Sequence, residues 1–396
     1  MASQDILDGG KANRGSFIND PKVRGLFFQV LVILLLIAAT WWIVNNVIDN
    51  LRRSNIASGF SFLRSRAGFD IAESPIAYTS DSTYGRAILV GFLNTLIVAG
   101  TGIATATVIG FLVGIGRLSN NWLIRKICTV YVELFRNIPP LLVIFFWYFG
   151  VLSVLPGARE SIHLPFETFL NNRGFYSPRP VWGDGAWLTG VAFVIGVALA
   201  WFVARRARQR QMATGQSFPV FRTSIALIVG LPLLAFALSG FPLSFDVPQQ
   251  STFNLTGGFQ VKPEFLSLYL ALSFYTAAFI AEIVRAGIVG VPKGQTEAFS
   301  ALGLRSGQGL RLVVIPQAMR IIIPPLTSQY LNLTKNSSLA IAIGYPDLVA
   351  TGGTVLNQTG QAIEIVVIWM VIYLGISLVT SAFMNWFNAK MALVER

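Results

Sequence analysis

Charged residues are scarce in this chain, since Asp, Glu, Lys and Arg together make up 12% of its 396 residues. Soluble domains carry about 25% charged residues, so the composition favours a membrane protein. Thiols and imidazoles are scarcer still, with one cysteine, Cys128, and one histidine, His163. A single cysteine excludes a disulfide within the chain, and two such residues cannot form a Cys/His metal cluster. We therefore expect no metal site here.

Two kinds of catalytic motif are also missing. The sequence contains no G-x-x-x-x-G-K-[ST] phosphate-binding loop, so the chain itself is not expected to hydrolyse ATP. It contains no G-x-S-x-G motif either, which argues against an intramembrane hydrolase. The net charge of +12 is better explained by cytoplasmic loops that face anionic lipid or an acidic partner than by nucleic acid.

Long apolar runs are abundant. Residues 87–116, 137–158 and 365–389 contain no charged side chain, and each is long enough to cross a hydrocarbon core, which needs roughly 20 helical residues. Within lipid an open backbone would leave peptide groups unpaired, so every span is predicted to be a helix. The expected fold is an all-α membrane protein with eight spans, at about 26–44, 87–115, 130–155, 186–204, 223–241, 265–285, 318–343 and 364–387.

Lysine and arginine are distributed unequally between the two sides of these spans. If the N-terminus is cytoplasmic, 19 of the 30 basic residues lie on the cytoplasmic side and nine on the other. The positive-inside rule therefore predicts that both termini are cytoplasmic. The basic run RRARQRQ at 205–211 is interpreted as part of this topology signal. Residues 45–85 form a long outer segment rich in Ser, Asn and Arg. The outer segment 156–185 is expected to be irregular because four prolines interrupt it.

The stretch EAFSALGLRSGQGLRLVVIPQ, residues 297–317, is polar and bent although it lies between apolar runs. Thr296 is placed to cap a helix that starts at Glu297, whose carboxylate suits the positive end of the helix dipole. Gly303 fits a left-handed position after that helix, and Ser306 is placed to cap a second short helix. A passive connector needs neither so tight a turn nor exposed apolar side chains.

The same stretch resembles the signature of permease subunits of bacterial ABC importers. That signature is E-A-x-x-x-x-G followed by nine residues, an aliphatic residue, one residue, an aliphatic residue and proline. The matching positions here are Glu297, Ala298, Gly303, Val313, Ile315 and Pro316. The chain departs from the pattern with Phe299, where a second alanine is usual, and with Ile315, where leucine is usual.

Further stretches are similar to the polar amino-acid (histidine/glutamine/glutamate) branch of that family. They are residues 131–149, in which Val143 replaces a common glutamine, residues 275–298 and residues 333–348. The resemblance covers about 86–155 and 265–390 and implies the five-helix core of a type I ABC importer, with about three extra helices. Residues 1–85, with the first span, and 156–264, with two more, are interpreted as additions. The enlarged form resembles the larger permease of general L-amino-acid importers.

The resemblance implies a role for each part. Residues 295–312, called the coupling segment below, would contact a cytoplasmic ATPase subunit. Expected partners are two ATPase subunits that bind ATP and Mg²⁺, a second related permease in a heterodimer, a periplasmic amino-acid-binding protein and membrane lipid. The expected location is the bacterial inner membrane. The residues implied in ATPase coupling are Glu297, Ala298, Leu302, Gly303, Arg305 and Pro316.

Polar residues inside predicted spans mark candidate positions of a transport path, because ionisable groups in lipid usually face a cavity or a partner. Glu133 and Arg136 lie three apart and are predicted to pair, as are Glu282 and Arg285. Each pair could brace a gate instead of meeting substrate. The cation of Lys335 could meet a substrate carboxylate, Glu364 or the neighbouring permease. The full candidate set is Asn94, Thr95, Glu133, Glu282, Lys335, Asn336, Ser337 and Ser338.

These features together predict the permease subunit of an ATP-driven importer that moves L-amino acids by alternating access between two pre-existing packings. The alternatives are an ion-coupled secondary transporter, which usually shows internal repeats and broken helices, and a membrane scaffold without transport activity.

Overall fold

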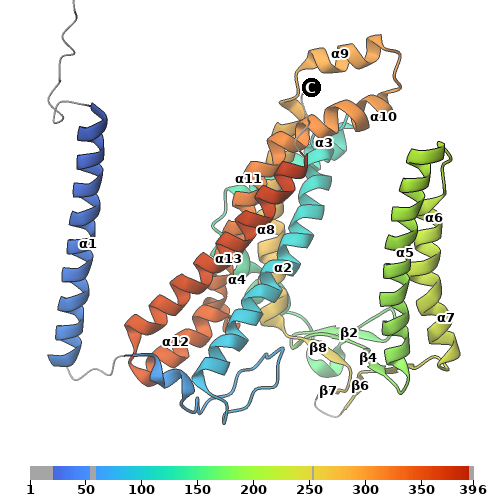
Figure 1. Cartoon of the computed structure of the whole chain (residues 1–396). Coiled ribbons are helices and arrows are strands. Elements are labelled where there is room, and N and C mark those ends of the chain that lie inside the picture. Colours follow the sequence, from blue (N-terminus) through green and yellow to red (C-terminus); the bar gives the residue numbers. More distant parts are fainter. Residues whose placement is uncertain (1–20, 54–58, 252–253, 392–396) are drawn as a thin grey trace, which may run out of the picture.

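The computed structural model describes residues 21–53, 59–251 and 254–391, and most of them are helical (Figure 1). The long helices are α1 (Pro21–Arg53), α2 (Tyr84–Gly116), α3 (Trp122–Arg136), α5 (Ala186–Thr214), α8 (Pro263–Val289), α11 (Ile315–Asn336), α12 (Leu348–Thr359) and α13 (Ala362–Met391). The short helices are α4 (Pro140–Phe145), α6 (Val220–Ile225), α7 (Leu231–Leu238), α9 (Lys293–Ala301) and α10 (Ser306–Gly309). Segments of 3₁₀ or π helix are η2 (Phe60–Arg64), η3 (Phe146–Leu152), η4 (Ala158–Glu160), η5 (Ala226–Gly230), η6 (Leu310–Val314) and η7 (Ser337–Ile343).

Seven helices in the described part of the chain are long and apolar enough to cross a membrane, and a bent pair adds an eighth. The predicted span count is therefore confirmed, but the third predicted span is not one straight helix. It consists of residues 122–136 and 140–152, which meet at an angle of 109°. Pro139 and Pro140 explain the break, because a proline lacks the N–H that a continuing helix requires and clashes with the preceding turn.

The core of the bundle forms where α2 packs along α8. A Cβ added at Gly110 would lie 2.5 Å from Ile280 Cγ2, and one at Gly114 would lie 2.7 Å from the carbonyl oxygen of Ala281. Small residues thus let the two helices approach closely, as they do in many membrane proteins. Around this contact α3, α4, α11 and α13 complete the bundle.

Strands form between the bundle and the α5–α7 hairpin, and four of them lie in residues 156–185, which were expected to be irregular. They are β1 (Ile162–Leu164), β2 (Thr168–Asn171), β3 (Gly174–Ser177), β4 (Arg179–Trp182), β5 (Leu243–Asp246), β6 (Gln249–Gln250), β7 (Leu255–Thr256) and β8 (Phe259–Val261). One antiparallel sheet has the order β1-β2-β3-β8, and β4-β5 and β6-β7 form two ribbons. The prediction for 156–185 was wrong, because three of its four prolines lie outside strands and Pro180 lies in a two-stranded ribbon, where proline is tolerated.

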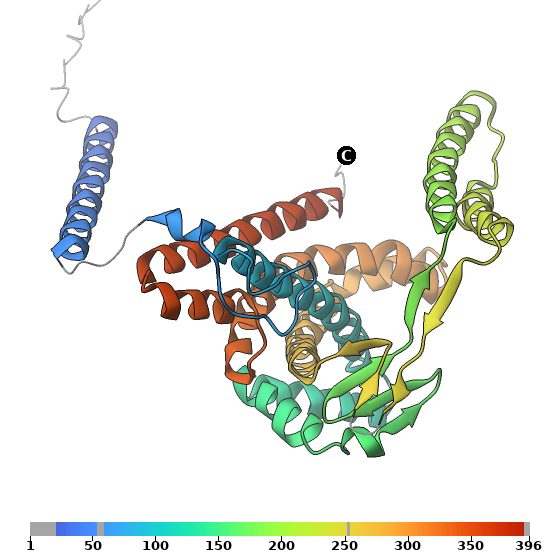
Figure 2. The same ribbon diagram turned by 90° about the horizontal axis from the view of Figure 1, so that it is seen from below.

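The two ends of the bundle differ in structure. Helices α9 and α10 project from one end, where α13 also ends, and the sheets lie at the other (Figure 1). Viewed along the bundle, α1 and the α5–α7 hairpin stand apart on opposite sides of the core (Figure 2). Within the hairpin the backbones touch, since a Cβ added at Gly196 would lie 2.4 Å from the carbonyl oxygen of Leu227. The sheets join this hairpin to the bundle.

Candidate functional site

The coupling segment folds into two short helices with a sharp turn between them. The turn residue Gly303 has a φ of +70°, in the left-handed region where side chains are disfavoured. The N–H of Gly303 donates to the carbonyl of Ser300 at 3.0 Å, and that of Leu304 donates to the carbonyl of Phe299 at 3.2 Å. This pair of bonds is a Schellman motif, so the predicted role of Gly303 in the turn is confirmed.

Both predicted helix caps of this segment were wrong. Helix α9 begins at Lys293, directly after Pro292, so Thr296 lies inside the helix and does not cap it. Proline is favoured at helix starts because its φ is already helical, which explains the earlier start. Helix α10 begins at Ser306, and the N–H of Arg305 before it donates to Gln308 Oε1 at 3.2 Å. Arg305 therefore occupies the cap position.

The two helices are held together by an aromatic ring against a glycine. Phe299 of α9 is 6% exposed, and a Cβ added at Gly309 of α10 would lie 2.3 Å from its Cδ2 atom. Three other apolar side chains of the segment, Leu302, Leu310 and Leu312, are exposed, and Leu302 is 79% exposed. The predicted coupling residues Glu297, Ala298, Leu302, Gly303 and Arg305 are all exposed, and Pro316 at the start of α11 is half-buried.

An ion cluster joins three helices at the same end of the bundle. Arg117, which follows α2, contacts the carboxylate of Glu282 in α8. Arg285 Nη2 lies 2.6 Å from Glu282 Oε1, so the predicted pair of Glu282 and Arg285 is confirmed. Glu133 of α3 lies 3.9 Å from Arg117. The cluster therefore ties α2, α3 and α8 together close to the coupling segment.

The predicted pair of Glu133 and Arg136 was wrong. Arg136 lies over the ring of Phe279, 5.7 Å from its centroid, where a cation–π contact satisfies it. Glu133 turns toward Arg117, a residue far away in the sequence that the three-residue spacing could not indicate. The side chain of Glu133 is 57% exposed, and that of Arg117 is 11% exposed, so Arg117 depends on the cluster far more than Glu133 does.

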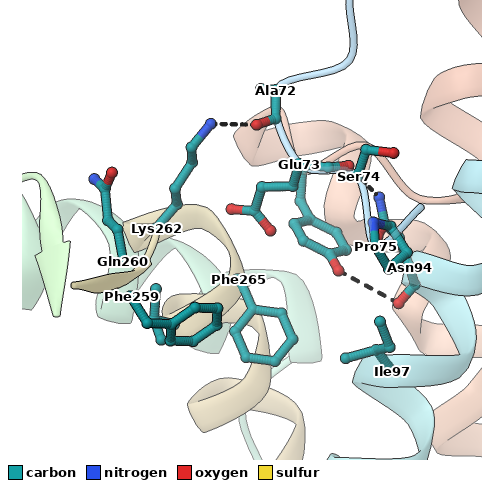
Figure 3. A pocket seen from close by; sticks show the side chains of 12 residues that line it. Ala72, Glu73, Ser74, Pro75, Asn94, Ile97, Phe259, Gln260, Lys262 and Phe265 are labelled. Carbon is teal, nitrogen blue, oxygen red and sulfur yellow. Dashed lines mark hydrogen bonds between the residues drawn. The ribbon is translucent and has the colours of Figure 1, made fainter. Parts of the chain in front are cut away.

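A cavity of about 490 Å³ lies at the opposite end, beside the sheets (Figure 3). We call it the outer pocket. Four parts of the chain contribute to it: the segment before α2, α2 itself, the junction of β8 with α8, and Tyr345. Its lining residues are Ala72, Glu73, Ser74, Pro75, Asn94, Ile97, Phe259, Gln260, Val261, Lys262, Phe265 and Tyr345.

The predicted polar pair on α2 supports the wall of this pocket. The buried amide of Asn94 donates through Nδ2 to the carbonyls of Glu73 and Pro346, each at 2.9 Å. Tyr345 donates its hydroxyl to the carbonyl of Asn94 at 3.3 Å. Thr95 Oγ1 accepts from the N–H of Leu348 at 3.1 Å. Both side chains thus hold outer segments against α2.

The other predicted group, residues 335–338, lies at the end of α11. Lys335 is exposed and makes no ion pair with any residue that the structure describes. Glu364, one possible partner for it, instead accepts from the N–H of Gly59 at 2.7 Å. The hydroxyls of Ser337 and Ser338 donate to carbonyls one turn back, and Asn336 is half-buried. Among the described residues, no side-chain hydrogen bond or ion pair joins this group to the lining of the outer pocket.

Sequence reasoning did not select the two charged residues of the outer pocket, Glu73 and Lys262. Both lie just outside apolar spans, in segments without periodicity, so no pattern marked them. Burial raises the pKa of Glu73 to about 7, against the opposing effect of the nearby Lys262 ammonium. A raised pKa of a carboxyl group beside a cavity is the signal that could have identified Glu73 as a candidate site residue.

Comparison with known proteins identifies relatives along almost the whole chain. The family described as "Binding-protein-dependent transport system inner membrane component" matches residues 192–393. The chain is 67% identical to the "General L-amino acid transport system permease protein AapQ" of Rhizobium johnstonii, over 96% of this chain and 95% of that protein. It is 42% identical to the "Glutamate/glutamine/aspartate/asparagine transport system permease protein BztB" of Rhodobacter capsulatus, over 96% of each chain.

Proposed function

The chain belongs to the family of binding-protein-dependent transport system inner membrane components, and on this basis we propose how its parts serve amino-acid import. It is the permease subunit of an amino-acid ABC transporter and not its catalytic subunit. We propose that it moves L-amino acids, because the names of its relatives specify a general L-amino-acid system and a system for acidic amino acids and their amides. This family assignment disfavours the secondary transporter and the scaffold.

The coupling segment carries the mechanical part of the proposal. It projects beyond the bundle (Figure 1), exposes Leu302 and is rigid at Gly303 because of its paired turn hydrogen bonds. A soluble ATPase subunit with a complementary groove would bind such a projection. ATP and Mg²⁺ would be held by two such ATPase subunits, and the coupling segment would pass their closure to α8 and α11 on either side of it.

The orientation follows from the same element. With the coupling segment facing the cytoplasm, the C-terminal end of α13 is cytoplasmic as well, since both lie at the same end (Figure 1). The positive-inside count supports this orientation and a cytoplasmic N-terminus. The sheets and the outer pocket then face the periplasm, where an amino-acid-binding protein would deliver substrate. A second, related permease would complete the translocation path.

Proteoliposomes that contain the full complex test this function. We expect ATP-dependent uptake that requires the binding protein and accepts acidic, neutral and basic L-amino acids. Strict preference for one class would contradict broad specificity. Uptake that persists without the ATPase subunits would contradict the ATP-driven mechanism.

A further inference from the structure

The outer pocket places opposite charges on two of its walls (Figure 3). Glu73 comes from the segment before α2, and Lys262 from the residue that precedes α8. From this arrangement we propose that the pocket binds a free L-amino acid, with Glu73 facing the α-ammonium group and Lys262 facing the α-carboxylate. This proposal rests on the proposed function and adds a substrate site at the periplasmic end of the permease.

The two charges do not neutralise each other directly. The described residues include no ion pair between Glu73 and Lys262. Lys262 donates to the carbonyl of Ala72, which uses one of the three donors of its ammonium group. The Oε1 atom of Glu73 is buried and has no hydrogen-bond partner in the structure. Lys262 therefore keeps donors for a ligand, and one carboxylate oxygen of Glu73 is left without a hydrogen-bond partner.

The nearby carboxylate of Glu264 does not compete for this role. Its Oε1 atom accepts from the hydroxyl of Tyr148 at 3.2 Å, and Glu264 does not line the pocket. A buried carboxylate without a partner is costly, so Glu73 is stabilised by any cation that enters. An α-ammonium group supplies both the charge and the donors that its free oxygen lacks.

Aromatic rings complete the pocket. Phe259, Phe265 and Tyr345 line it, and the rings of Phe265 and Tyr345 lie 5.9 Å apart. Aromatic faces attract ammonium groups and also accept apolar side chains. The volume of about 490 Å³ lies within the range of small-molecule sites. A site that recognises the α-ammonium and α-carboxylate groups of the ligand, and surrounds its side chain with apolar groups, suits a system that accepts many amino acids.

The insertion at 156–264 gains a role from this assignment. Phe259 and Val261 belong to β8, which pairs with β3 of the same insertion, and Lys262 follows directly. One wall of the pocket is thus built from the insertion and held in register by a sheet. The opposite wall is held by Asn94, which bonds the carbonyl of Glu73.

Ligand binding to the purified full complex, without the binding protein, tests the proposal directly. The probe is radiolabelled L-glutamine, with two competitors: 4-aminobutanamide, which lacks the α-carboxylate, and glutaramic acid, which lacks the α-amino group. We expect Glu73→Gln and Lys262→Met each to weaken L-glutamine binding at least tenfold. Asp70→Asn and Arg64→Met, exposed charges of the same outer segment, serve as matched controls and are expected to change it less than twofold.

The competitors separate recognition from misfolding. In Lys262→Met, 4-aminobutanamide is expected to compete as well as L-glutamine, because the group that reads the carboxylate is gone. In Glu73→Gln, glutaramic acid is expected to compete as well as L-glutamine, because the group that binds the α-ammonium is gone. Equal losses for all three compounds in either variant, or unchanged L-glutamine binding, would overturn the assignment. Wild-type uptake of amino acids, measured on the same preparation, tests the proposed function separately.

Discussion

Replacing Gly309 with alanine should weaken the joint between this permease and its ATPase. Gly309 has a helical φ of −61°, where alanine normally stabilises a helix by about 1 kcal/mol. Its added Cβ would however lie 2.3 Å from the Phe299 ring, and overpacking of this kind costs about 1–3 kcal/mol. Because of this clash, the substitution is expected to destabilise the segment instead of stabilising it. The net cost is then up to about 2 kcal/mol, so we expect affinity for the ATPase subunit to fall by up to about 30-fold.

The assay is a double-mutant cycle on the reconstituted complex, with ATPase affinity and ATP-dependent uptake as readouts. Gly309→Ala is measured in the wild-type background and in Phe299→Ala, which restores the alanine usual in the family resemblance. In that background the clash is absent, so Gly309→Ala should be neutral or stabilising. Gly307→Ala, whose Cβ would meet nothing within 4 Å, is the control. Equal losses from Gly309→Ala in both backgrounds would refute the packing argument.

Three further outcomes are expected. Gly303→Val forces a β-branched residue into a φ of +70°, so membrane insertion should persist while uptake stops and the ATPase no longer co-purifies; normal co-purification and uptake would contradict this. Glu282→Gln leaves Arg117 without its main partner and should lower the free energy of unfolding of the purified protein by about 1–3 kcal/mol. Substitution of the exposed Glu133 by Gln should lower it by less than about 0.5 kcal/mol. Equal shifts in melting temperature for the two variants would disprove this difference. The pKa of Glu73 is about 7, and the titratable groups near its carboxyl group are Lys262, Glu264 and Tyr345. Because an ammonium ligand binds the ionised form of Glu73, L-glutamine affinity should fall about tenfold from pH 8 to pH 6. A pH profile as flat as that of Glu73→Gln would exclude this titration.

The sequence was sufficient for the membrane-spanning helices, apart from the break in the third one, and for the turn at Gly303. Apolar runs of about 20 residues specify spans because the lipid excludes any other backbone structure, and a left-handed turn selects glycine. The start of a helix was harder to predict where several neighbouring residues could each serve as the cap. Thr296 and Ser306 are good capping residues, but Pro292 and Arg305 occupy the cap positions, because the start of each helix depends on the whole segment.

Contacts between distant segments were the part that could not be predicted. Three-residue spacing indicated a pair of Glu133 with Arg136, but Arg117 and Phe279 lie closer in space. The strands at 162–182 are three or four residues long, too short for alternation to stand out, and β3 pairs with β8, about 80 residues further along. The outer pocket could not be predicted for the same reason, since Glu73 and Lys262 are distant in the sequence and lie close together only in the folded chain.

Helix α8 connects the two functional ends of the molecule. Lys262 and Phe265 at its start line the outer pocket, Glu282 and Arg285 near its end form the ion cluster, and α9 follows a few residues later. Its 27 residues span roughly 40 Å without an internal break. Glu73, in contrast, is attached to α2 through Asn94. The two charges of the pocket are anchored to different helices, so a shift of α8 against α2 driven at the coupling segment would change their separation. If the proposed site is right, ATPase closure and amino-acid affinity would be linked, and by reciprocity a ligand in the pocket would bias the same two packings.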